Sequence, residues 1–254
     1  MKNYQQVLFR IYLILNIMIP ISLAHSAEIQ VLASTGMYSL LHEMIPSYET
    51  KSGNKLIVSY DTSNIVLNRV KSGESSDLII LTGAAMDDLI QQGNISHIGR
   101  TNIAQSGIGV AIKTGSVVPN ISTPEALKAT LLQAKSISFT ATGASGIYFS
   151  GVLEKLGIQE ELKTKIKNPQ GGHIAKLVAN GEAEIGVQMT SELKGVPGAQ
   201  YVGPLPPPLQ MLTVFTGGIF SNAKEAKISQ EFLQFITDVR FKDRYEKIGL
   251  EMVK

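Results

Sequence analysis

The chain has 254 residues, of which 44% are hydrophobic and 17% are charged. This apolar share is enough to form one or two globular domains, and it excludes a wholly disordered chain. The sequence contains no cysteine, which excludes disulfides, thiolate metal sites and an anchor on an acylated cysteine.

Residues 1–27 have the features of a secretory signal peptide. Lys2 and Arg10 are basic, residues 11–24 are mostly apolar, and small residues precede Ala27. The apolar stretch is shorter than the roughly 20 residues of a membrane-spanning helix, so we expect cleavage after Ala27 and export of a chain that does not span the membrane. The segment holds 2 of the 23 basic residues and none of the 21 acidic ones. The remainder is formally neutral, which argues against nucleic acid as a partner.

Residues 28–93 alternate short apolar strands with amphipathic helices, which is the pattern of parallel α/β units. Expected strands cover residues 29–33, 56–60 and 78–81. Expected helices cover residues 37–52, 64–71 and 85–92. Pro46 is expected to kink or shorten the first of these helices.

A second block of the same type begins at Gly107. Thr123 and Pro124 predict a helix start, because a hydroxyl cap and a first-turn proline are typical there. The other expected elements are strands at 108–113, 137–140 and 184–189, and helices at 147–156, 160–167 and 173–180.

The proline-rich residues 202–209 predict a stiff connector without regular helix or central strand. A strand at 211–216 and two further helices complete the chain. We therefore expect an α/β fold of two lobes, each a mixed, mainly parallel sheet flanked by helices, with a ligand cleft between them. The expected lobes are 28–106 with 209–254, and 107–208.

Motifs of catalysis do not occur at their required spacings. His42 and Glu43 begin like a helical zinc-protease motif, but Pro46 stands where the second histidine ligand belongs. The run from Gly143 to Gly146 lacks the spacing of a serine-hydrolase elbow. A site formed by His42, His97 and His173 remains a remote alternative. We expect neither an enzyme nor a cofactor.

Small and hydroxyl residues recur where strands end and helices begin. Such loops are Ser34-Thr35-Gly36, Thr62-Ser63-Asn64, the run 142–146 and Gln170-Gly171-Gly172. Because helix N-termini carry unpaired N–H groups and a partial positive charge, several of them around one cleft can hold an anion without Lys or Arg. Each loop taken alone is more typical of ordinary helix capping, and it is the four loops together that make an anion site an equal alternative.

These residues resemble the periplasmic molybdate-binding proteins of ABC importers, within the type II solute-binding superfamily. The resemblance spans essentially the whole exported chain. It is carried by Val31-Leu32-Ala33-Ser34, the run 72–78, Ser145-Gly146-Ile147-Tyr148 with Leu156-Gly157, and the run 180–187. It implies a monomeric periplasmic protein whose lobes close around an oxyanion such as molybdate or tungstate, for delivery to an inner-membrane ABC permease.

The resemblance also implies which residues bind the ligand. Ser63 matches the family's second-loop serine, and Ser145 and Gly171 match backbone N–H donors. Gly36 stands in place of a serine and Met189 in place of a tyrosine. The expected ligand-binding residues are Ser34, Thr35, Gly36, Thr62, Ser63, Ser145, Gly171 and Met189.

Loss of two hydroxyl donors leaves other ligands open, because each hydrogen bond to a charged ligand contributes about 1.5–3 kcal/mol. A small organic anion, bound by a diverged or adhesin-like protein, is the main alternative. Its further contacts would come from Gln188, Thr190, Asn64 or His173. An exported enzyme that uses Asp61 or His173 is a weaker alternative.

Overall fold

The computed structural model describes residues 26–253, so the expected signal peptide lies outside the described residues except for its last two positions. The strands are β1 (Glu28–Ser34), β2 (Lys55–Asp61), β3 (Leu78–Thr82), β4 (Thr101–Lys113), β5 (Ile137–Ser138), β6 (Ile166–Lys167), β7 (Ile185–Met189), β8 (Ala199–Pro204), β9 (Leu212–Ile219) and β10 (Glu251–Met252). The α-helices are α2 (Tyr38–Ser52), α3 (Ser63–Lys71), α4 (Gly83–Gln91), α5 (Pro124–Gln133), α6 (Ala144–Lys155), α7 (Gln159–Leu162), α8 (Ile174–Ala179), α9 (Thr190–Leu193), α10 (Ala226–Ile236) and α11 (Lys242–Lys247). Short 3-10 turns are η1 (Thr35–Met37), η2 (Pro207–Leu209) and η3 (Val239–Phe241).

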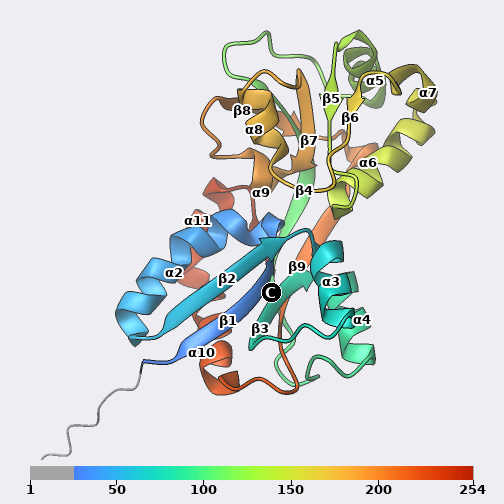
Figure 1. Ribbon diagram of the computed structural model, residues 1–254. Coiled ribbons are helices and arrows are strands. Elements are labelled where there is room, and N and C mark those ends of the chain that lie inside the picture. Colours follow the sequence, from blue (N-terminus) through green and yellow to red (C-terminus); the bar gives the residue numbers. More distant parts are fainter. Residues whose placement is uncertain (1–25, 254) are drawn as a thin grey trace, which may run out of the picture.

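The strands follow the order β2-β1-β3-β9-β4-β7-β5-β6, and β8 and β10 both pair with β4. Strands β1, β2 and β3 are parallel, whereas β9 runs antiparallel to both β3 and β4. Residues 101–107 of β4 pair with β9, and residues 108–112 pair with β7. This long strand therefore connects the two lobes that Figure 1 shows one above the other. The lobe boundaries expected from the sequence stay a prediction.

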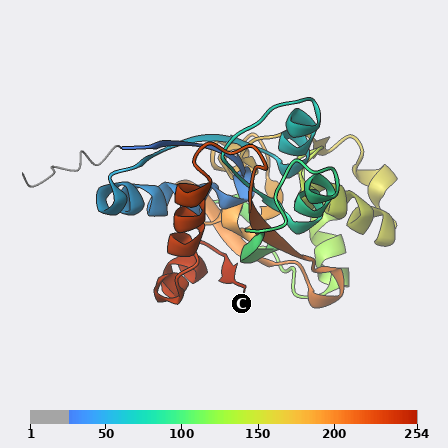
Figure 2. The same ribbon diagram turned by 90° about the horizontal axis from the view of Figure 1, so that it is seen from below.

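In the first lobe, successive side chains point to opposite faces of the strands and form two packing layers. Residues Val31 and Ile80 share a core with Leu40 of α2 and Leu233 of α10. Leu32 and its neighbours on the opposite face pack with α3 and α4. Since successive side chains of a strand point to opposite faces, one apolar strand can serve both layers. Figure 2 shows the sheet between these helix pairs.

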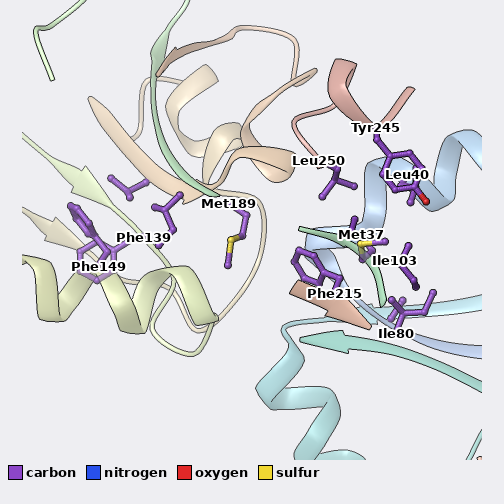
Figure 3. Packing of buried hydrophobic residues seen from close by; sticks show 14 of the residues in the cluster. Met37, Leu40, Ile80, Ile103, Phe139, Phe149, Met189, Phe215, Tyr245 and Leu250 are labelled. Atoms are coloured by element: carbon purple, nitrogen blue, oxygen red, sulfur yellow. The ribbon is translucent and has the colours of Figure 1, made fainter. Parts of the chain in front are cut away.

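In the second lobe, β7 likewise packs against helices on both of its faces. Val187 packs with Phe149 and Leu153 of α6, and the main cluster also contains Leu127 of α5. On the other face, a Cβ at Gly186 would lie 2.6 Å from Val178 of α8. Glycine at this position therefore allows α8 to approach the strand closely. Figure 3 shows Met189, at the end of β7, between Phe139 and Phe149 on one side and Phe215 and Met37 on the other.

Several local predictions are corrected by the structure. Helix α2 continues through Pro46 to Ser52, so the proline does not shorten it. The predicted helix at 160–167 is wrong beyond Leu162, because Ile166 pairs with Ile137 of β5 and long-range pairing overrides local helix propensity. Strand β4 begins before residue 108, at Thr101.

The proline-rich connector is partly regular, because its first residues belong to β8. Pro204 pairs there with Gly109 of β4. Strand β8 pairs with β4 alone, and proline is tolerated at such an edge because its missing N–H has no ladder partner to lose. Within residues 26–253, no helix is both long enough and apolar enough to cross a membrane.

Candidate functional site

A small cavity lies between the lobes, at the ends of strands β1, β2, β3 and β7. Both lobes contribute to its wall. Its lining residues are Ser34, Thr35, Gly36, Thr62, Ser63, Thr82, Thr140, Gly143, Ala144, Ser145, Gln188, Met189, Glu192 and Phe215. This set contains hydroxyl and amide groups and one carboxyl, but neither lysine nor arginine.

Three helices begin at this cavity, and each is at least nine residues long. Their N-caps are Thr62 for α3, Thr82 for α4 and Gly143 for α6. The first turns of these helices direct unpaired N–H groups and the positive ends of the helix dipoles toward the cavity. The arrangement favours an anion without any cationic side chain.

Hydroxyl groups of the cavity keep hydrogen-bonding capacity free. Ser63 Oγ accepts a hydrogen bond from the backbone N–H of Thr82 at 3.2 Å, and Ser34 Oγ accepts one from Gly36 at 3.4 Å. Since a hydroxyl has one donor as well as its acceptor sites, each serine still has a proton to donate. Thr140 is only 2% exposed, and its Oγ1 has no hydrogen-bond partner. An unsatisfied buried hydroxyl is costly, so its place in the cavity wall points to a ligand contact.

The start of α6 is fixed by close packing against Thr140. A Cβ at Gly146 would lie 1.8 Å from the Thr140 carbonyl oxygen, and one at Gly143 would lie 2.3 Å from Thr140 Oγ1. Glycine at both positions lets the first turn of α6 approach the end of β5. The N–H groups of this turn and the free hydroxyl of Thr140 therefore lie together.

Two apolar side chains, those of Phe215 and Met189, also line the cavity. The Phe215 ring lies against Gly36, where a Cβ would be 2.3 Å from the ring atom Cζ. Phe215 therefore fills the space that a side chain at residue 36 would occupy. Met189 is 3% exposed and adds to this apolar surface.

Glu192 is an ionisable group that sequence reasoning missed. It is 7% exposed, and its Oε1 accepts a hydrogen bond from Gln188 Nε2 at 2.9 Å. Burial raises the pKa of Glu192 to about 7, against the opposing effect of hydrogen bonds from the Thr35 side chain and the Met189 backbone. The free site therefore has a carboxyl that is substantially protonated at neutral pH.

Direct contacts between the lobes hold the cleft closed. Asn64 Nδ2 donates to the Thr142 carbonyl at 2.9 Å, and Ser191 Oγ donates to the Gly36 carbonyl at 2.8 Å. Tyr38 and His173 meet edge to face with ring centroids 5.4 Å apart. These contacts cross from one lobe to the other, so a bound molecule would be largely enclosed.

Most of the predicted ligand-binding residues lie together in this cavity. Ser34, Thr35, Gly36, Thr62, Ser63, Ser145 and Met189 all line it. Gly171 does not, because it lies beside Asp61 and Thr62, where a Cβ would be 3.6 and 3.7 Å from their side chains. Binding roles for all eight residues stay predictions.

The other candidates divide between the cavity and its surroundings. Gln188 lines the cavity, whereas Asn64 contributes to the contact between the lobes. The Thr190 hydroxyl lies 3.4 Å from the Tyr201 hydroxyl, and His173 packs on Tyr38. Within the described part of the chain, no group of three or more His, Asp or Glu residues is placed to hold a metal ion.

Comparison with known proteins places the chain in a family. The sequence profile described as "Bacterial extracellular solute-binding protein" matches residues 29–251. The chain belongs to this family of bacterial extracellular solute-binding proteins. One relative of this solute-binding protein is the aconitate isomerase of a Pseudomonas species, which is 31% identical over 229 residues, 88% of this chain and 87% of the relative.

Solved structures share the two-lobed α/β fold of the solute-binding protein. The periplasmic molybdate-binding protein of Azotobacter vinelandii aligns with a TM-score of 0.76 and 16% identity, over 89% of this chain and 100% of that one. PEB3 bound to L-phospholactate, a protein of Campylobacter jejuni, aligns with a TM-score of 0.65 and 14% identity over the same shares. The resemblance to molybdate-binding proteins of the periplasm is thus confirmed at the level of family and fold.

Proposed function

We propose that this solute-binding protein captures a small organic anion bearing carboxylate groups in the cavity between its lobes. The observation that carries the proposal is the meeting of three helix starts with the unpartnered, buried hydroxyl of Thr140. A carboxylate accepts hydrogen bonds from N–H and O–H groups and is attracted by the positive ends of helix dipoles. Ser63 and Ser145 are the further donors that we assign to it.

The composition of the wall supports an organic anion over a bare oxyanion such as molybdate. A tetrahedral oxyanion needs donors on all sides, but Phe215 and Met189 present apolar surface to the cavity. Such surface suits the carbon skeleton of an organic acid. The name of the relative that is 31% identical, aconitate isomerase, points to the same ligand class.

The biological role in this proposal follows the expectation from the sequence. Residues 1–27 direct export to the periplasm, and residues 28–106 with 209–254 and 107–208 form the two lobes. The open form admits the anion, and closure adds contacts such as the hydrogen bond between Asn64 and Thr142. An inner-membrane ABC permease receives the anion from the closed monomer.

A thermal-shift series on residues 28–254 tests this function. We expect aconitate or a related small carboxylate to raise the melting temperature more than molybdate, tungstate or sulfate does at equal concentration. A ligand that binds the folded state alone stabilises it by about 2.7 kcal/mol at a hundredfold excess over its Kd. Stabilisation by molybdate or tungstate and by no carboxylate would refute the organic anion.

Isomerisation of the captured carboxylate is a second candidate function. It is favoured by the name of the 31% identical relative together with the position of Glu192 in the cavity, since a proton-transferring group works best with a pKa near the ambient pH. Proton NMR of cis-aconitate incubated with the protein separates the two functions. An isomerase converts it to the trans isomer, whereas a binding protein leaves the spectrum of excess ligand unchanged.

A further inference from the structure

Glu192 presents an electrostatic problem for a site that binds anions. It is the one acidic or basic side chain that lines the cavity within the described residues. An ionised carboxylate and an anionic ligand in the same enclosed space repel each other strongly, because little water is present to screen them. The site can hold an anion well only if Glu192 is neutral.

The surroundings of Glu192 hold its side chain in place. Gln188 Nε2 donates to Glu192 Oε1 at 2.9 Å and to the Gly172 carbonyl at 3.0 Å. Gln188 Oε1 accepts from the Ile174 backbone N–H at 3.0 Å, so its amide is held at both ends. The Glu192 carboxyl therefore cannot leave the cavity wall without breaking these contacts.

Within residues 26–253, no lysine or arginine lines the cavity to offset the negative charge of an ionised Glu192. The titratable groups on the elements packed around α9 are Tyr38, His42, Glu43, Tyr48, Glu49 and Lys51 on α2, His173 and Lys176 at α8, Tyr201 on β8, Lys113 at the end of β4 and Lys194 after α9. None of these lines the cavity. Lys194 Nζ lies over the Tyr201 ring, 5.5 Å from its centroid.

We propose that Glu192 is protonated whenever the cavity holds an anion, so that capture of the ligand takes up a proton at this carboxyl. The inference rests on the proposed function. The neutral carboxylic acid donates a hydrogen bond to the ligand. It therefore favours an ionised ligand, which can accept that hydrogen bond. Binding and protonation are then linked: the anion favours the protonated site, and the protonated site favours the anion.

This linkage fixes the pH dependence of the affinity. Because burial raises the pKa of Glu192 to about 7 in the free protein, protonation costs little below that pH. Above it, the Kd for a fully ionised ligand rises by about tenfold for each pH unit. A glutamine at this position has no proton to take up, so the Kd of Glu192→Gln stays flat.

Titration calorimetry with aconitate tests the proposal. Repeating each titration at pH 8 in two buffers of different ionisation heat counts the protons taken up on binding. We expect the wild type to take up about 0.9 proton more than Glu192→Gln, since about nine tenths of a carboxyl with a pKa near 7 is ionised at that pH. Glu154→Gln is the matched control, because Glu154 is exposed on α6, and it should behave as the wild type.

The outcomes separate the inference from the function on which it rests. Wild-type binding with no proton uptake, and a Kd that is constant between pH 7.5 and 8.5, would overturn the role of Glu192 and leave the anion site standing. Absence of binding to any small carboxylate at any pH would overturn both. If Glu192→Gln does not fold, the pH dependence of the wild-type Kd decides alone.

Discussion

Replacement of Thr140 by valine is expected to weaken anion binding by about 10- to 150-fold while leaving the free protein as stable as the wild type or more so. The loss reflects one hydrogen bond to a charged ligand, about 1.5–3 kcal/mol. Stability does not fall, because the hydroxyl has no partner in the free protein and valine has nearly the same shape. Calorimetry with aconitate and a thermal melt measure the two effects.

Ser229→Ala is the matched control for Thr140→Val. The Ser229 hydroxyl is also fully buried and without a partner, but it lies on α10 and away from the cavity. We expect its loss to leave the affinity for the anion unchanged. Equal affinities of both variants and the wild type would show that the Thr140 hydroxyl does not touch the ligand.

Replacement of Gly146 by alanine is expected to destabilise the protein by more than about 4 kcal/mol. The new Cβ would lie 1.8 Å from the carbonyl oxygen of Thr140, and a backbone atom cannot turn aside as a flexible side chain can. The start of α6 must move away from β5, and the anion site moves with it. A melting temperature lower by roughly 10 °C or more is expected, or a chain that does not fold.

Gly151→Ala is the control, because it makes the same substitution on the same helix. Gly151 is exposed, and a Cβ there meets no atom within 4 Å. Alanine should stabilise the helix by up to about 1 kcal/mol. Similar melting temperatures for the two variants would contradict the close approach of α6 to Thr140.

The order of strands and helices was largely predictable, because local sequence patterns indicate each element. Apolar strands such as β3 face helices on both sides and read as short continuous apolar runs. Helix starts carry their own signals: Thr123 Oγ1 accepts a hydrogen bond from Ala126 at 3.2 Å, and Pro124 follows it, as the sequence indicates. Of the eight ligand-binding residues that the resemblance implied, seven line the cavity.

The remaining features depend on contacts between distant parts of the chain. Phe215 follows Gly36 by more than 170 residues, and nothing near Gly36 shows that an aromatic ring fills its missing side chain. The sequence around Ile166 has a helical pattern, and only the pairing of Ile166 with β5 shows that this residue lies in a strand. Glu192 looks like an ordinary surface acid, because its burial results from the packing of α9 between the lobes.

Thr140 combines a feature that is visible in the sequence with one that depends on the fold. A hydroxyl residue at the end of a predicted strand was visible in the sequence, and it stands just before the glycine-rich start of α6. Its significance comes from the lack of a hydrogen-bond partner, which only three-dimensional packing reveals. Gly171 is the opposite case, since the resemblance implied a ligand contact whereas the fold places it outside the cavity lining, beside Asp61 and Thr62.

A crystal structure of residues 28–254 grown with aconitate tests the proposed anion site. We expect one molecule between the lobes, with a carboxylate against the first turns of α3 and α6 and within hydrogen-bond distance of Thr140 Oγ1. Its carbon skeleton should face Phe215 and Met189, and a second polar group should accept a proton from Glu192. A closed cavity that stays empty at saturating ligand, or a ligand bound elsewhere on the surface, would contradict an anion site between the lobes.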